Sequence, residues 1–284
     1  MVSLIDVRHK CIEGRFFPYD DWRDKLFVSP SIFLVWIFVN LGWSGNAVSW
    51  LSGVVTIFGG MLIATNNKIL ILIGACSYML FYLLDYVDGG VARYRNASGI
   101  AGQYVDWIMH AASAISISTG IFIGALNDTH MSWIMPFGLL FILTSSLQLD
   151  RFSLGWWAIC MYRQQNKRDN KLASEICNVF VDDESKKKSK SNFWRSMKII
   201  STVTFHENYA IFVLPIFAIL NILLPSDKFP DFRVVLTVIG GTIYFLHVVH
   251  EIVSISSENK IAAAYNKLFH SAEKPNLPAD HFFY

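Results

Sequence analysis

The sequence predicts an all-α protein that crosses a membrane several times. Of its 284 residues, 53% are hydrophobic and only 16% are charged, whereas a soluble domain carries about 25% charged residues. The mean hydropathy is +0.38, and apolar stretches of the length that spans a bilayer, about 20 residues, recur along the chain. The net charge is only +2, so the composition does not indicate a nucleic-acid partner.

Residues 1–44 are predicted to form an N-terminal cytoplasmic and interfacial arm. Residues 1–27 mix aromatic and charged side chains, which is typical of a segment at a membrane surface. The apolar run Pro30–Trp43 is short for a span. It is therefore predicted to be an interfacial or re-entrant helix ahead of the first span.

Residues 45–256 are predicted to form a domain with six transmembrane helices. Asp150 and Arg151 interrupt the fourth apolar stretch, which makes a break in that helix conceivable. The six apolar stretches that predict the spans are 46–64, 69–92, 102–124, 132–161, 205–224 and 232–256.

The distribution of cations predicts the orientation of the spans. The N-terminal arm, the 93–101 loop, the basic loop 162–198 and the tail 257–284 carry 20 of the 24 Lys and Arg residues. Cytoplasmic loops are enriched in these residues, so both termini and the 93–101 loop are predicted to be cytoplasmic, which requires an even number of spans. The run Lys186–Lys190 could bind anionic headgroups, although a solvated cytoplasmic loop is the simpler interpretation.

The stretch DYVDGGVARYRNASGIAGQYVD, from Asp85 to Asp106, carries three acids and two arginines at the edge of the predicted spans. Charge at membrane depth is costly, so it indicates a functional site. Asp85 and Asp88 are three positions apart and share one helix face. Gly102, Asp106 and His110 share a face of the next predicted helix. The short connection predicts two antiparallel neighbouring helices whose polar faces meet.

Three carboxylates that converge repel one another unless a cation lies between them. Hard divalent cations such as Mg2+ prefer oxygen ligands of this kind. Arg93 can hold a phosphate group with two donors, and Gly89 and Gly102 would let a ligand approach the backbone. The alternative is a purely structural network in which these acids pair with Arg93 and Arg95.

At these residues the chain resembles the CDP-alcohol phosphotransferase (CDP-alcohol phosphatidyltransferase) family, whose pattern is D-x2-D-G-x2-A-R-x8-G-x3-D-x3-D. The Pro-Asn-x-x-Thr element that often precedes the family's first span has a weakened counterpart at 45–49, GNAVS. The resemblance covers about residues 28–256. The motif positions that match are Asp85, Asp88, Gly89, Ala92, Arg93, Gly102 and Asp106.

The resemblance implies a transferase of phospholipid or related lipid or glycan biosynthesis that depends on one or two divalent ions, Mg2+ or Mn2+. A phospho-alcohol group would pass from a CDP-alcohol donor to an acceptor hydroxyl, and CMP would be released. Asp85, Asp88 and Asp106 would bind metal, with Asp106 also part of the catalytic site. The CDP or CMP pocket would be lined by Gly89, Ala92, Arg93 and Gly102.

Partners and location follow from the same resemblance and from the charge distribution. The expected partners are the donor, the acceptor and membrane lipids, with a homodimer as an open possibility because family members are often dimeric. The active site is expected to face the cytoplasm. A bacterial inner membrane is the favoured location, with the endoplasmic reticulum membrane as the alternative. Neither the donor alcohol nor the acceptor is legible in the sequence.

The chain departs from the family pattern at the last position, where His110 replaces an aspartate. Histidine can accept a proton near neutral pH and so serve as the general base. Its neutral imidazole could instead ligate the metal. As a third interpretation, the chain is a pseudoenzyme that binds nucleotide without turnover.

A different class of function, an ion-coupled transporter, would place its acids near the membrane midplane in broken helices. The predicted clustering of the acids at one cytoplasmic helix end favours the enzyme. Asp150 and Arg151 are candidates for lining an acceptor pocket or for pairing with each other where the helix leaves the membrane. Polar residues near the cytoplasmic ends of the last two predicted spans are helix-end residues in the simpler interpretation, and His247, His250 or Glu251 is an alternative base if His110 is not the base: His206, Glu207, His247, His250 and Glu251.

Overall fold

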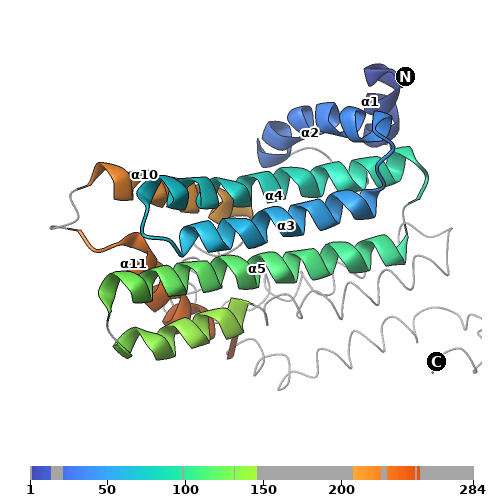
Figure 1. The fold of residues 1–284 in the computed structure, drawn as a ribbon. Helices are drawn as coiled ribbons and strands as arrows, with labels where there is room; N and C mark the ends of the chain where they lie inside the picture. The colour runs from blue at the N-terminus through green and yellow to red at the C-terminus, as the bar shows by residue number, and fades with distance from the viewer. Residues whose placement is uncertain are drawn as a thin grey trace, which may run out of the picture.

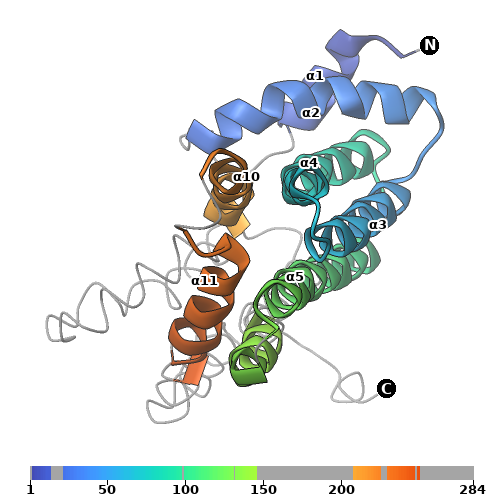
Figure 2. The same cartoon turned by 60° about the vertical axis from the view of Figure 1, so that its left-hand side comes forward.

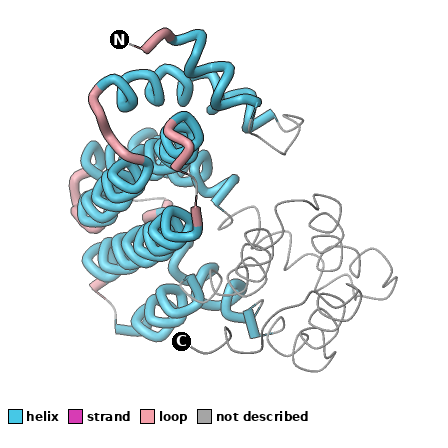
Figure 3. The backbone as a smooth tube through the Cα atoms, turned by 90° about the vertical axis from the view of Figure 1, so that its right-hand side faces the viewer, coloured by secondary structure: helices cyan, strands magenta, loops and turns pink. Residues whose placement is uncertain are grey.

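The computed structural model describes residues 2–13, 22–97, 99–130, 132–145, 207–224, 229–246 and 248–249. Almost all of these described residues are helical and none of them lies in a strand (Figure 3). The all-α prediction is therefore confirmed for this part of the chain. Outside it lie the basic loop 162–198, the tail 257–284 and the polar candidates Asp150, Arg151, His206, His247, His250 and Glu251.

Two N-terminal helices, α1 (Leu4–Glu13) and α2 (Trp22–Asn40), lie together on one side of the bundle (Figures 1 and 2). The second helix begins earlier than the predicted run Pro30–Trp43 and contains Pro30 within it. The Trp36 indole Nε1 donates a hydrogen bond of 2.8 Å to the Val2 carbonyl and joins the two segments. Their buried contacts with the next helices form one cluster: Val7, Cys11, Val35, Val39, Val48, Leu84, Val87 and Val91.

The three helices that follow are long and apolar enough to cross a membrane: α3 (Gly45–Ile63), α4 (Lys68–Tyr94) and α5 (Ile100–Thr129, apolar over Tyr104–Thr129). They coincide with the predicted spans 46–64, 69–92 and 102–124. These three helices indicate a membrane protein, as the composition predicted.

Local hydrogen bonds fix where α3 begins and where α4 ends. The Ser44 hydroxyl accepts a hydrogen bond from the Ala47 backbone N–H and caps the start of α3. After α4, Asn96 adopts a left-handed conformation with φ of 52°, and the Ala97 N–H donates 2.9 Å to the Ala92 carbonyl. This closing turn ends α4 and lets α5 run back along the bundle.

The helix α3 lies between α4 and α5 and packs along both of them (Figures 1 and 2). The prediction that α4 and α5 are direct neighbours is therefore wrong for most of their length. Gly59 faces Gly74 of α4, whereas Gly60 faces the Ser116 backbone carbonyl and Gly120 of α5. Consecutive helical residues point about 100° apart, so this glycine pair lets α3 approach two helices at backbone contact distance.

Gly60→Ala is expected to destabilise the protein by about 1–3 kcal/mol, the usual cost of overpacking. The added methyl group would collide with the Ser116 backbone, which has no side-chain freedom with which to move aside. The measurement is thermal unfolding in detergent. Gly99→Ala is the matched control, because a methyl group at Gly99 meets no atom within 4 Å. Equal losses for the two variants would contradict the proposed close packing.

The remaining described helices cover the other side of the bundle. The helix α10 (Glu207–Leu223) packs on α4, and α11 (Phe232–Ile239), continued by η2 (Gly240–Tyr244), packs on α5 (Figure 2). An apolar helix also covers Ser132–Ser145 and includes the short η1 (Ser132–Ile134). The predicted spans 132–161, 205–224 and 232–256 extend beyond the described residues, so the count of six spans stays a prediction.

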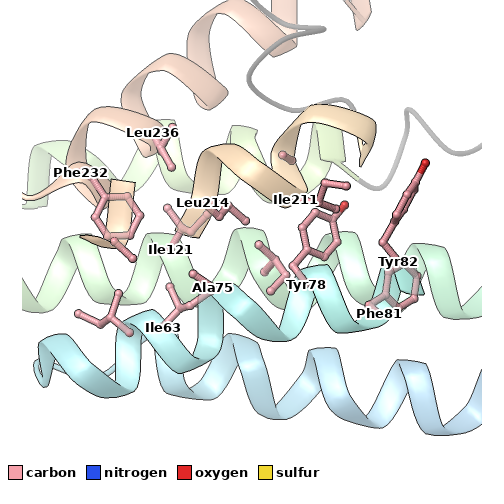
Figure 4. Packing of buried hydrophobic residues seen from close by; sticks show 14 of the residues in the cluster. Ile63, Ala75, Tyr78, Phe81, Tyr82, Ile121, Ile211, Leu214, Phe232 and Leu236 are labelled. Carbon is pink, nitrogen blue, oxygen red and sulfur yellow. The ribbon is translucent and has the colours of Figure 1, made fainter. Parts of the chain in front are cut away.

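The main hydrophobic core joins the end of α3 to α4, α5, α10 and α11 (Figure 4). Aromatic and aliphatic side chains from helices far apart in the sequence meet there, which holds α10 and α11 against the three long helices. The labelled members of this core are Ile63, Ala75, Tyr78, Phe81, Tyr82, Ile121, Ile211, Leu214, Phe232 and Leu236.

A buried arginine, Arg233, joins α11 to the end of α3. Its side chain is only 2% exposed. Its Nε and Nη2 each donate 2.9 Å to the Asp231 carboxylate, and its Nη1 donates to the carbonyls of Ile63 at 2.9 Å and Thr65 at 2.6 Å. Gly124 of α5 leaves the space that the guanidinium group occupies. This role of Arg233 was not predicted, because nothing near it in the sequence reveals these distant carbonyls.

Candidate functional site

The motif residues come together at one end of the bundle, where α3 begins, α4 ends and α5 begins (Figure 1). We call this region the motif end. The backbones are close there, since a Cβ on Gly45 would lie 2.9 Å from the Asp88 carbonyl oxygen and 3.1 Å from the Ala92 Cβ. A Cβ on Gly102 would lie 3.3 Å from the Asn46 Oδ1. Small residues therefore let the three helices converge.

Asp85 of α4 and Asp106 and His110 of α5 meet at the motif end. The His110 Nε2 lies 3.0 Å from the Asp85 Oδ1 and 3.4 Å from the Asp106 Oδ1. One potential ligand atom from each residue lies within 4.8 Å of the other two, and all three side chains are partly buried. This cluster could hold a metal ion. The two polar faces thus meet through their side chains, as predicted, although α3 separates most of the two helices.

The imidazole of His110 is held in place by an aromatic neighbour. The Phe81 ring contacts it edge to face, with ring centroids 5.0 Å apart and an interplanar angle of 80°. Phe81 is 1% exposed and belongs to the main core. The buried Phe81 ring therefore gives the imidazole a packed neighbour, while its Nε2 faces the two carboxylates.

Asp88, predicted as a metal ligand, lies outside the three-residue cluster. Its side chain is 7% exposed, and its Oδ2 accepts a hydrogen bond of 2.5 Å from the Ser49 hydroxyl of α3. It is still close enough to interact electrostatically with Asp85, Asp106 and His110. Asp88 is therefore held by α3 beside the cluster and not within it.

The partnership of Ser49 with Asp88 was not predicted, although one signal was available. Asn46 and Ser49 are three positions apart and project from one face of α3. In the sequence this stretch stood out only as a weakened element before the first span. The structure places both residues at the motif end, against Gly102 and Asp88 respectively.

The four residues predicted to line a nucleotide pocket all lie at the motif end, with different contacts. The guanidinium of Arg93 lies over Gly89, where a Cβ would come within 3.1 Å of its Nη1. Gly102 faces Asn46 of α3. Ala92 packs against Gly45, so its small size also serves the contact between α3 and α4.

Asp85 and Asp106 lie further inside their helices than predicted, since the sequence placed the acids at the helix ends. Tyr94, the last residue of α4, comes nine positions after Asp85, which corresponds to ~14 Å along a helix. Asp106 is the seventh residue of α5. The cluster is therefore set within the helices and not in the loop that connects them.

Comparison with known proteins adds no assignment: no family model and no curated protein sequence matches the chain.

Proposed function

We propose that this chain is an integral membrane CDP-alcohol phosphotransferase with a divalent metal ion at the motif end. The observation that carries the proposal is the convergence of Asp85, Asp106 and His110 from two helices into a group that could hold a metal ion. It coincides with the sequence motif of the family that the chain resembles. Mg2+ or Mn2+, one or two ions, would occupy the site.

The surroundings of the cluster suit an anionic diphosphate substrate. The N-termini of α3 and α5 both lie at the motif end, and helix N-termini favour negative charge. Arg93 lies one turn beyond Gly89 and offers a planar group of donors. A CDP-alcohol carries this kind of charge, so Gly89, Ala92, Arg93 and Gly102 are the residues proposed to contact it.

The proposed reaction is a displacement at the phosphorus atom that bears the first alcohol. The acceptor hydroxyl oxygen forms the new bond to phosphorus, the bond between phosphorus and the CMP oxygen breaks, and the acceptor proton passes to a base. A bound divalent ion would stabilise negative charge on the diphosphate oxygens. Asp85, Asp106 and His110 would hold the ion, and Arg93 would orient the phosphate.

The proposed setting is a membrane whose cytoplasmic leaflet faces the motif end, with the bacterial inner membrane preferred to the endoplasmic reticulum. Membrane lipids, a CDP-alcohol donor and a hydroxyl acceptor are the proposed partners, and a homodimer is a further possibility. The transporter alternative is weaker, because the acids coincide with the spacing of the family motif and lie at the same end as Arg93 and Gly89, a set that suits a diphosphate substrate.

The reverse reaction tests this function whatever the acceptor is. Purified protein is incubated with labelled CMP, Mg2+ or Mn2+ and a total lipid extract, and mass spectrometry searches for a new CDP-alcohol. A metal-dependent product that is missing with Asp106→Asn supports the transferase and identifies its donor. Metal-dependent CMP binding without any product supports a nucleotide-binding pseudoenzyme. The observation that favours this second candidate is that His110 replaces the last aspartate of the motif.

His110→Ala is expected to lower turnover at least about 100-fold, because the imidazole either holds the metal ion or takes the proton of the acceptor, and each role is worth at least that much. The measurement is the initial rate of CDP-alcohol formation at saturating CMP and metal. His130→Ala provides the control, because His130 follows the other end of α5. A much smaller loss would show that the imidazole serves neither as an essential metal ligand nor as the base.

A further inference from the structure

We infer that His110 binds the metal ion through Nε2 and that the site therefore prefers a first-row transition-metal ion such as Mn2+ over Mg2+. This inference rests on the metal site of the proposed function and not on the identity of the substrates. Of the roles that the sequence left open for His110, it selects that of metal ligand. It also attributes the metal preference to the histidine that replaces the last aspartate of the motif.

The separations between donor atoms match those around a single ion. Neighbouring ligand atoms in an octahedron with bonds of about 2.1 Å lie about 3 Å apart. The His110 Nε2 lies 3.0 Å and 3.4 Å from the Asp85 and Asp106 Oδ1 atoms. A small movement of each side chain would admit an ion between them, and an ion would relieve the repulsion between the carboxylates.

The direction of the imidazole favours a ligand over a general base. Phe81 packs against the imidazole ring, and Nε2 lies 3.0 Å from the Asp85 carboxylate and 3.4 Å from the Asp106 carboxylate. Asp106 and His110 are also one helical turn apart, so α5 presents both donors to the same point. When Nε2 holds an ion, its lone pair is not available to take the proton of an acceptor hydroxyl.

The donor set determines the preferred metal. Mg2+ is a hard ion that favours oxygen ligands and binds imidazole poorly. Imidazole nitrogen suits first-row transition metals, whereas carboxylate oxygen suits both Mg2+ and Mn2+. Mn2+ shares the oxygen ligands of Mg2+ but, as a d-block ion, also binds imidazole. Two carboxylates with one imidazole should therefore bind Mn2+ more tightly, relative to Mg2+, than three carboxylates would.

The first experiment uses the purified full chain in detergent and MnCl2 alone, with no substrate. Pulsed electron paramagnetic resonance of the bound Mn2+ is expected to show coupling to an imidazole nitrogen-14 nucleus. The coupling should vanish in His110→Asp and persist in His130→Asn. Mn2+ binding without nitrogen coupling in the unmodified protein would overturn the inference, as would the absence of any Mn2+ binding. The measurement on the unmodified protein tests the inference even if neither variant folds.

The second experiment measures competition between the two ions. Free Mn2+ is followed by its resonance signal while Mg2+ is added, for the unmodified protein and for His110→Asp, which restores the family aspartate. The ratio of Mn2+ to Mg2+ affinity is expected to fall at least about 10-fold in the variant, in the range seen when metal-site residues are changed. An unchanged ratio would overturn the inference.

These readouts are separable from the transferase test. Nitrogen coupling together with a failure to form any CDP-alcohol would support His110 as a ligand and contradict the proposed function. A CDP-alcohol product without nitrogen coupling would support the transferase and return His110 to the role of base.

Discussion

Asp106→Asn is expected to lower turnover at least about 1,000-fold, because metal stabilisation of the transition state is worth several kcal/mol. The Asp106 carboxylate is one of the three groups whose ligand atoms converge, and asparagine offers a neutral oxygen in place of a charged one. The variant should also bind Mn2+ far more weakly. The measurements are the rate of CMP-dependent CDP-alcohol formation and the Mn2+ affinity of the same preparation.

Asp128→Asn is the matched control for this variant. Asp128 lies on the same helix, is exposed and is near the opposite end of α5 from the motif. The same change of charge should therefore leave both rate and affinity unaltered. Turnover of Asp106→Asn equal to that of the unmodified protein would refute the metal site as the catalytic centre, even with Mn2+ bound.

Arg233→Met is expected to reduce stability by about 3–5 kcal/mol, the cost of removing one partner of a buried ion pair. The substitution leaves the Asp231 carboxylate without its guanidinium partner. It also removes the donors that the carbonyls of Ile63 and Thr65 share, at the end of α3. Chemical or thermal unfolding in detergent measures the loss.

Arg8→Met supplies the control, since Arg8 is exposed on α1. Because Arg233 lies at the end of the bundle away from the motif, Mn2+ bound to the folded variant should still show the coupling of the unmodified protein. A loss of stability no larger than that of Arg8→Met would contradict the structural role assigned to Arg233.

The acids, glycines and arginine of the motif could be chosen from the sequence because charge in an apolar helix is conspicuous whatever the fold. The relative placement of these residues could not be predicted. Asp88 was grouped with Asp85 by helical spacing, yet the structure turns it toward Ser49, 39 positions away in the sequence. A short connecting loop suggested direct contact between α4 and α5, yet the glycines of α3 let that helix lie between them.

Local sequence was enough to predict a helical, apolar chain, the approximate limits of its three long helices, and the residues that carry the candidate chemistry. These properties depend on composition, capping residues and helical periodicity, all of which act over a few positions. Packing between helices was needed to bring His110 against Asp85, 25 positions away, and Arg233 against Ile63, 170 positions away. Such contacts depend on how closely whole helices can approach one another. That distance is set by the sizes of the side chains on all the helices in the bundle, so it cannot be predicted from any one segment of the sequence.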